Sequence, residues 1–243
     1  MSAALHVLEL GLVEFTHALA LQRRAAMLRI SGALSADLLI LCEHPPVVTL
    51  GRSAKSAGHV LLSREALAER GAALHEIERG GDVTFHGPGQ LVGYTIIDLK
   101  QHKKDLHWFL RQTEEAIIRA VAPFGVIAER NAGFTGVWVQ GRKLASIGVH
   151  ARDWVTWHGF ALNVTTDLSW FDTIVPCGID GVTMTTVGRE MIRKPGAALA
   201  QDLRSAIAEA FAEVLSLQLR KLPDELAAEL TTSAYAPVEP DTR

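Results

Sequence analysis

One of the two cysteines in this sequence, Cys177, lies in a setting that suits a nucleophile. It occurs in the segment VPCGI at 175–179, between a proline and a glycine. A loop of this kind is an unusual place for a buried structural thiol, although free cysteine is often a small, inert core residue. A thiol with an ordinary pKa of about 8.5 is mostly protonated at neutral pH. A nucleophilic Cys177 therefore requires a cation, a base or a helix N-terminus nearby.

Four basic residues are candidates for activating that thiol: Lys143, His86, His150 and His158. Lys143 begins the segment KLASIGVH, where period-two alternation places it on an otherwise apolar strand face. The alternative for Lys143 is a solvated residue at the end of a turn. The histidines could instead form a metal site or a Cys-His pair, but they lack the short spacings of metal-binding motifs, and no orienting carboxylate for a triad is evident.

The segment RGGDVTFHGPGQLVGYTIIDL at 79–99 is the clearest candidate for a binding loop. Its first half is rich in glycine and polar residues, and its second half, 92–99, has the composition of a strand. Glycines let a backbone approach a ligand closely and present N–H groups to an acyl or carboxyl oxygen. The alternative is a plain turn, but the presence of Arg79 and His86 favours binding.

Composition restricts the class of protein. The chain has 243 residues, 48% of them hydrophobic, which is enough for a substantial core. A formal charge of -3 and 6% aromatic residues argue against a nucleic-acid binder. Two distant cysteines make no disulfide framework, no apolar run reaches the roughly 18 residues of a membrane span, and the N-terminus lacks a signal-peptide pattern. We therefore expect a cytoplasmic protein.

The elements that must position these residues begin with a strand over 5–10 and an amphipathic helix over 13–30. Two strands are predicted within 37–50, separated by a proline-enforced bend, with Cys42 facing the core. Ser63 is expected to cap a short helix that ends before Gly71. A strand over 74–78 then leads into the glycine-rich segment.

The second half of the chain predicts one capped helix and a series of hairpins. Asp105 is expected to cap a helix that continues to Val121. Consecutive hairpins are then predicted from strands at 126–130, 137–140, 143–151 and 158–164. The segment 165–194 is irregular, which is typical of a functional loop, and a last helix is predicted over 196–217.

Helices separated from runs of antiparallel strands favour an α+β fold with a mixed, largely antiparallel sheet flanked by helices. We expect a single catalytic domain over 1–221 and a partly disordered C-terminal tail over 222–243, whose last ten or so residues are the least ordered.

Five motifs together resemble the lipoyl(octanoyl) transferase family. They are EHPPVVTLGRS at 43–53, RGGDVTFHGPGQLVGY at 79–94, GRKLASIGVH at 141–150, HGFALNV at 158–164 and PCGI at 176–179. They occur in the family's order over a region from Leu5 to Leu217. The resemblance implies the fold of biotin and lipoate protein ligases.

The family resemblance also implies an activity. Octanoyl would pass from octanoyl-acyl carrier protein through a cysteine thioester to a specific lysine of lipoyl domains, such as those of 2-oxoacid dehydrogenase subunits and the glycine cleavage H protein, as the first step of endogenous protein lipoylation. By motif match Cys177 is the nucleophile, and Lys143 lowers the pKa of its thiol and then serves as acid and base. The matched substrate-binding residues are Arg79, Gly80, Gly81, Asp82, Val83, Thr84, Phe85, His86, Ser146, Ile147, Gly148, Gly159, Phe160 and Ala161.

Thioester exchange requires no ATP, cofactor or metal, and nothing in the sequence resembles a P-loop. We expect a monomer without nucleic-acid or membrane partners. Asp82 occupies a position that varies in similar sequences, and Phe160 is bulkier than the leucine often found there, so Phe160 is expected to influence chain-length preference. Because acyl carrier proteins are acidic, Arg142, Arg52 and Lys55 are candidates for a basic contact patch.

Three alternatives remain. An ATP-dependent lipoate- or biotin-type ligase would share the fold but would need no nucleophilic cysteine. An amidotransferase would move the acyl group between lipoyl domains. A non-catalytic protein could bind acyl carrier protein or lipoyl domains through the same surface, and Cys177 would then be dispensable.

Overall fold

The computed structural model describes residues 3–53, 57–178, 181–192 and 196–233. Within these ranges the side chains of Ala57, Cys177 and Ser233 lie outside the description. The elements follow in the order β1 (Ala4–Leu12), α1 (Phe15–Ser31), β2 (Asp37–Glu43), β3 (Val47–Leu50), η1 (Ala57–His59), α2 (Arg64–Glu69), β4 (Ala73–Glu76), β5 (Val83–His86), β6 (Gln90–Ile96), η2 (Leu99–Gln101), α3 (Leu106–Val121), η3 (Ala122–Phe124), β7 (Glu129–Asn131), β8 (Phe134–Val139), β9 (Arg142–Arg152), β10 (Val155–Asn163), η4 (Leu168–Thr173), η5 (Pro176–Gly178), α4 (Val187–Glu190), α5 (Leu199–Val214), β11 (Gln218–Lys221) and α6 (Asp224–Ser233).

A large sheet runs through the molecule in the strand order β11-β1-β2-β6-β10-β9-β8-β7. Strand β1 pairs in parallel with β11 and β2, whereas the remaining pairs of this sheet are antiparallel. The predicted hairpins account for the run from β7 to β10. The prediction of a mixed, largely antiparallel sheet is therefore confirmed.

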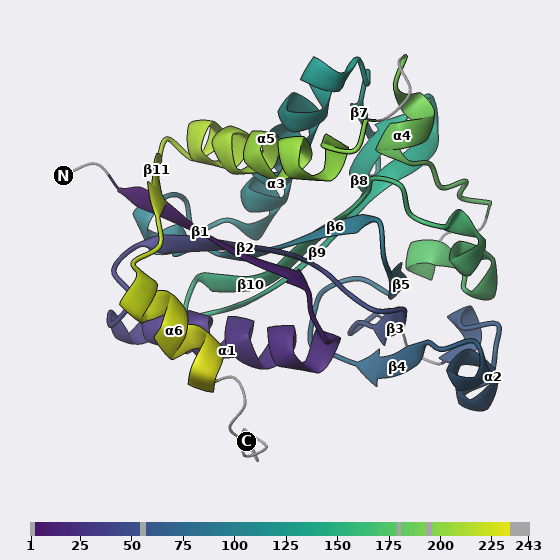
Figure 1. Cartoon of the computed structure of the whole chain (residues 1–243), viewed down its shortest axis with the longest axis horizontal. Helices are drawn as coiled ribbons and strands as arrows, with labels where there is room; N and C mark the ends of the chain where they lie inside the picture. Colours follow the sequence, from purple (N-terminus) through teal and green to yellow (C-terminus); the bar gives the residue numbers. More distant parts are fainter. Residues whose placement is uncertain (1–2, 54–56, 179–180, 193–195, 234–243) are drawn as a thin grey trace.

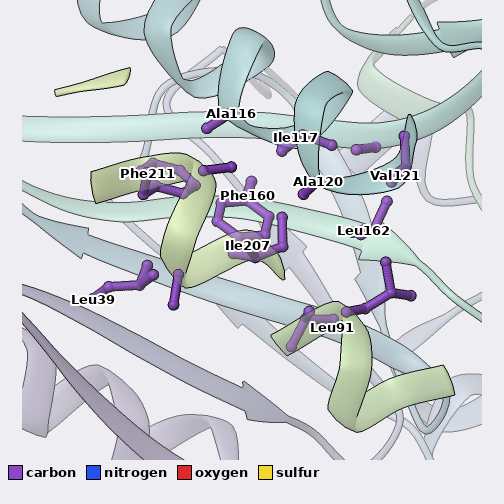
Figure 2. Packing of buried hydrophobic residues seen from close by; sticks show 14 of the residues in the cluster. Leu39, Leu91, Ala116, Ile117, Ala120, Val121, Phe160, Leu162, Ile207 and Phe211 are labelled. Atoms are coloured by element: carbon purple, nitrogen blue, oxygen red, sulfur yellow. The ribbon is translucent and has the colours of Figure 1, made fainter. Parts of the chain in front are cut away.

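Helices cover both faces of this sheet (Figure 1). On one face α3 and α5 lie side by side, and they pack on the sheet through a cluster of buried apolar side chains (Figure 2). On the other face α1 and α6 lie against a second cluster. Asp105 caps α3 as predicted, because its carboxylate accepts a hydrogen bond of 3.0 Å from the backbone N–H of Trp108.

A second, smaller sheet has the order β4-β3-β5 and lies with α2 beyond one end of α1 (Figure 1). The sequence placed residues 83–86 in a loop, but they form the strand β5, which pairs antiparallel with β3 from Val47 to Leu50. Both strands are fully buried, so the pairing follows from apolar contacts with segments distant in sequence. The glycine-rich segment is therefore held on both sides by strands, β5 before Gly87 and β6 after Gly89.

The C-terminal region differs from the expected tail. Residues Asp224–Ser233 form α6, and Leu230 is completely buried in the cluster shared with α1. An exposed ion pair of 3.0 Å between Arg24 and Glu229 also joins the two helices. Short helices of this kind depend on burial against a neighbour, which their own sequence does not reveal. The last ten residues, 234–243, for which we expected the least order, lie outside the described residues.

None of the helices in the described ranges is both long and apolar enough to cross a bilayer.

Candidate active site

A cavity of about 270 Å³ opens beside the glycine-rich segment, between the two sheets. Its walls come from α1, from residues 77–86, and from β6, β9 and β10, with the β7–β8 turn contributing as well. The lining residues are Phe15, Ile77, Arg79, Gly81, Asp82, Val83, Thr84, His86, Val92, Tyr94, Gly133, Phe134, Thr135, Lys143, Ser146, Ile147, Gly148, His158, Gly159, Phe160 and Ala161.

The structure brings the three predicted substrate-binding segments together at this cavity. Among their residues, Gly80 and Phe85 are not part of its lining. The Gly80 N–H instead donates to the carbonyl of Val149 at 2.9 Å, which ties the glycine-rich segment to β9. The Phe85 ring stacks on Trp170 with a centroid distance of 5.0 Å. The sequence did not identify Phe15, Tyr94 or Phe134, which come from elements that become neighbours only in the folded chain.

Close backbone approach explains two of the glycines. A β-carbon on Gly148 would lie 2.7 Å from the carbonyl oxygen of Gly80, so β9 can approach the glycine-rich segment only without a side chain there. A β-carbon on Gly159 would overlap the carbonyl of Gly93 on the neighbouring strand. These glycines bring the backbones that form the cavity walls into contact.

Arg79 anchors the segment from inside. Its side chain is buried, and the guanidinium donates to the carbonyl oxygen of Thr49 at 2.8 Å and to the hydroxyl of Thr49 at 3.0 Å. The charge-assisted bonds fix the start of the segment against β3. Arg79 thus links the second sheet to the cavity wall.

Lys143 is buried at the cavity wall, with 1% of its surface exposed. Its ammonium lies over the ring of Trp138 at 5.1 Å from the centroid, a cation–π distance. A β-carbon at Gly136 would lie 2.8 Å from the Lys143 side-chain Cε, so the strand β8 leaves room for the lysine stem. The alternative of a solvated turn residue is therefore wrong.

The segment that carries Cys177 reaches the same region. Backbone hydrogen bonds join Lys143 to the later part of this segment, from Lys143 N–H to Thr183 at 2.8 Å and from Thr185 N–H to Lys143 at 2.9 Å. Cys177 itself belongs to the short helix η5, and its side chain lies outside the described residues. The next residue, Gly178, has a positive φ of 64°, and a β-carbon there would lie 2.8 Å from Oδ2 of Asp82. The backbone after Cys177 therefore contacts a residue of the cavity wall.

Asp82 is paired with a histidine that the sequence did not single out. His59 Nδ1 donates to Asp82 Oδ2 at 2.9 Å, across 23 residues of sequence. The other carboxylate oxygen of Asp82 accepts from the N–H of Val83 at 2.7 Å. This pair supplies the imidazole–carboxylate arrangement for which the sequence offered no candidate. No sequence pattern indicates it, because His59 and Asp82 meet only through tertiary packing.

Two of the three predicted histidines, His86 and His158, line the cavity, whereas the ring of His150 packs against Trp157 at 4.2 Å. Burial lowers the pKa of His86 from 6.5 to about 3 and also lowers the pKa values of His158 and His150. His86 donates through Nδ1 to Oε1 of Gln90 at 2.8 Å. The two cavity histidines are therefore neutral at neutral pH. Within the described ranges, no group of three or more His, Cys, Asp or Glu side chains could hold a metal ion.

The two described residues of the candidate basic patch, Arg142 and Arg52, differ in their surroundings. Arg142 forms a two-pronged ion pair with Glu190, with distances of 3.0 and 2.9 Å, which raises the pKa of the guanidinium. Arg52 is exposed, and Lys55 lies outside the described residues. A docking role for these residues stays a prediction.

Comparisons with known proteins agree with this architecture. Solved structures with the same fold include lipoate-protein ligase A bound with ATP, with a TM-score of 0.72 at 19% identity, covering 96% of this chain and 95% of that one. Another is a bipartite lipoate protein ligase from Thermoplasma acidophilum, with a TM-score of 0.71 at 19% identity, covering 96% and 92%. At these identities the likeness concerns the fold, and it confirms the predicted ligase-like architecture.

Sequence relatives are much closer. Three proteins named octanoyltransferase are 48% identical in Rubrobacter xylanophilus, 47% in Gloeobacter violaceus and 46% in Acidobacterium capsulatum. The matches cover 85%, 87% and 94% of this chain, and 94%, 90% and 98% of those relatives. The model of the lipoyl protein ligase A/B catalytic domain matches residues 14–212. Because this match spans most of the sequence, the chain belongs to the lipoyl protein ligase A/B catalytic domain family.

Proposed function

We propose that this protein is an acyltransferase that moves an octanoyl group from octanoyl-acyl carrier protein, through a thioester on Cys177, to a lysine of a lipoyl domain. The observation that carries the proposal is the burial of Lys143 at a cavity that the glycine-rich segment also lines. The names of relatives at 46–48% identity support the octanoyl group as the cargo.

In the first half-reaction, the Cys177 thiolate attacks the thioester carbonyl of the donor. The carbon–sulfur bond to the carrier breaks, and the departing thiolate takes up the proton that Cys177 gave to Lys143. Backbone N–H groups of the segments around the cavity stabilise the oxyanion. The acyl thioester on Cys177 has nearly the same energy as the donor thioester, so this exchange needs no nucleotide.

In the second half-reaction, the amine of the acceptor lysine attacks the Cys177 thioester. The carbon–nitrogen bond forms as the carbon–sulfur bond breaks, and the Cys177 sulfur leaves with the bonding electron pair. Lys143, which gave its proton to the carrier thiol, takes one proton from the attacking amine and passes it to the Cys177 sulfur, which restores the thiol. Because the product is an amide, this step makes the overall transfer favourable.

The apolar part of the cavity suits an alkyl chain. Burial of seven carbons stabilises binding by about 5 kcal/mol at roughly 0.8 kcal/mol per methylene. Chains that differ by one methylene are separated by only about 1 to 3 kcal/mol. Six- and ten-carbon donors are therefore expected to react more slowly than octanoyl but not to be excluded. We further propose that the reaction takes place in the cytoplasm and that the protein acts as a monomer.

Intact-protein mass spectrometry after mixing with octanoyl-acyl carrier protein tests the covalent route. Wild type should gain one hydroxylamine-sensitive octanoyl group, and Cys177→Ser should gain none. Cys42→Ala is the matched control, because burial raises the pKa of the Cys42 thiol and the residue is completely enclosed. Octanoyl transfer that persists in Cys177→Ser, or that requires ATP, would replace this proposal with a ligase mechanism.

A further inference from the structure

We propose that the His59–Asp82 pair accepts the proton that the acceptor lysine releases when the acyl group leaves Cys177. The inference rests on the proposed octanoyl transfer and adds a proton acceptor for its second half-reaction. It arises from the position of the pair between the cavity wall and solvent, beside the backbone that follows Cys177.

The proton balance of the two half-reactions is different. Exchange of one thioester for another consumes one thiol and produces one thiol, so no net proton is released. An acceptor lysine enters as an ammonium group with three protons, because its pKa is ordinarily about 10.4, and the amide product keeps one of them. One proton restores the Cys177 thiol, and the other must leave the site. The second half-reaction therefore needs a base that the first does not need.

The carboxylate of Asp82 orients the imidazole of His59. Asp82 is 10% exposed and lines the cavity, and its Oδ2 accepts the hydrogen bond of 2.9 Å from His59 Nδ1. Because Nδ1 carries this hydrogen, Nε2 of a neutral His59 is the basic nitrogen. The hydrogen bond to Asp82 holds the ring so that Nε2 is the nitrogen that takes up a proton.

The pair lies directly against the Cys177 segment. A β-carbon at Gly178 would lie 2.8 Å from Asp82 Oδ2 and 3.0 Å from Cε1 of His59, so both side chains touch the backbone at this residue. The carbonyl of His59 also accepts a hydrogen bond of 2.8 Å from Val175 N–H. The segment from 175 to 178 therefore lies against His59 at two residues, Val175 and Gly178. The charged group that the structure pairs with His59 is Asp82.

Exposure separates His59 from the other bases near the cavity. Its side chain is 43% exposed, so a proton taken up there can pass to water. Lys143 is 1% exposed, and His86 and His158 are buried, with pKa values that burial lowers. Lys143 thus transfers the proton that stays in the site, and His59 accepts the proton that passes to solvent.

Single-turnover measurements on the two half-reactions test this division of roles. Wild type, His59→Gln and Asp82→Asn are first octanoylated on Cys177, and lipoyl domain is then added. The rate of octanoylation should change by less than about threefold in His59→Gln. Amide formation at pH 7 should fall by about 100-fold in His59→Gln, a typical loss for a general base, and by a smaller factor in Asp82→Asn.

Three further readouts distinguish proton transfer from a merely structural effect. Added imidazole should restore amide formation in a His59→Ala variant, because the exposed ring leaves an opening to solvent. Raising the pH should bring the rate of amide formation in His59→Gln closer to that of wild type, since more of the acceptor amine is then neutral in solution. Cleavage of the acyl-enzyme by hydroxylamine, a neutral nucleophile, should be similar in wild type and His59→Gln.

His107→Gln is the matched control, because His107 is exposed on α3, on the far side of the large sheet from α1. Equal losses in both half-reactions, or a loss that imidazole does not restore, would overturn the inference, as would an unchanged rate of amide formation. The absence of an octanoyl adduct on wild type would instead overturn the proposed function itself.

Discussion

Phe160 on β10 and Gly93 on β6 are paired on neighbouring strands of the large sheet, and the Phe160 ring occupies the space that a side chain at residue 93 would need. The ring also stacks on Phe211 of α5, with a centroid distance of 5.5 Å (Figure 2). Phe160 also lines the cavity, so one aromatic side chain contacts β6, α5 and the cavity.

Gly93→Ala should destabilise the protein by about 1 to 3 kcal/mol, because the new methyl group overlaps a ring that cannot move away in a packed core. Gly196→Ala is the matched control, since no other residue in the described ranges, its chain neighbours aside, comes within 4 Å of a β-carbon at that position. Urea denaturation measures both free energies of unfolding. A double variant, Gly93→Ala with Phe160→Leu, should recover part of the loss. Equal stability of the two single variants would contradict this packing argument.

Phe160→Leu should alter the preference for acyl chain length. Loss of the ring enlarges the cavity, so the rate with a ten-carbon donor should rise relative to the rate with an eight-carbon donor, by roughly tenfold or more for the two additional methylenes. Phe109→Leu is the control, because Phe109 is buried in the same cluster but does not line the cavity. Identical relative rates with six-, eight- and ten-carbon donors in wild type and Phe160→Leu would refute the role of Phe160.

Lys143→Met should lower kcat/KM for octanoyl transfer by at least about 100-fold, because methionine fills a similar volume but cannot carry a proton. Lys103→Met, which changes a lysine with a side-chain exposure of 60%, should leave the rate near that of wild type. Circular dichroism should show that both variants fold. Substantial transfer by Lys143→Met would mean that this lysine has a structural role only.

Stability should decrease as the pH falls from about 6.5 toward 5, because buried histidines must remain neutral in the folded protein. The pKa of His86 falls from 6.5 to about 3 and that of His44 to about 4, in both cases chiefly through burial. Below pH 6.5 the unfolded chain therefore binds more protons than the folded one, so acid favours unfolding. Above that pH the contribution of these residues to stability is fully present.

The contribution of one histidine can be isolated with His86→Gln. The pH dependence of its unfolding free energy between pH 5 and 6.5 should be shallower than that of wild type, by an amount that approaches about 1.4 kcal/mol per pH unit near pH 5. Urea denaturation at a series of pH values provides the slopes. This range lies above the ordinary pKa values of Asp and Glu, so carboxyl groups contribute little. Parallel slopes would show that His86 is not held neutral.

Local patterns in the sequence were sufficient for most elements of the large sheet and for the helix caps. Alternation in the segment KLASIGVH predicted β9, the hairpin pattern that includes 158–164 predicted β10, and Asp105 and Ser63 predicted the starts of α3 and α2. These signals are local, because a strand alternates its own side chains and a cap bonds its own helix. The motifs around the cavity also led to the correct family and fold.

Tertiary structure alone decided the features that depend on distant neighbours. The alternation of the segment around Lys143 is compatible with either a solvated or a buried side chain. In the folded chain the side chain is buried, because Gly136 leaves space for it and it packs on the ring of Trp138. Residues 83–86 form a strand because they pair with the edge of β3. Residues 224–233 form a helix because they pack on apolar side chains of α1. His59 and Asp82 form a pair because chain segments separated in sequence meet beside Gly178. In each case the stabilising contact joins residues far apart in the chain, and a local sequence pattern carries no information about such contacts.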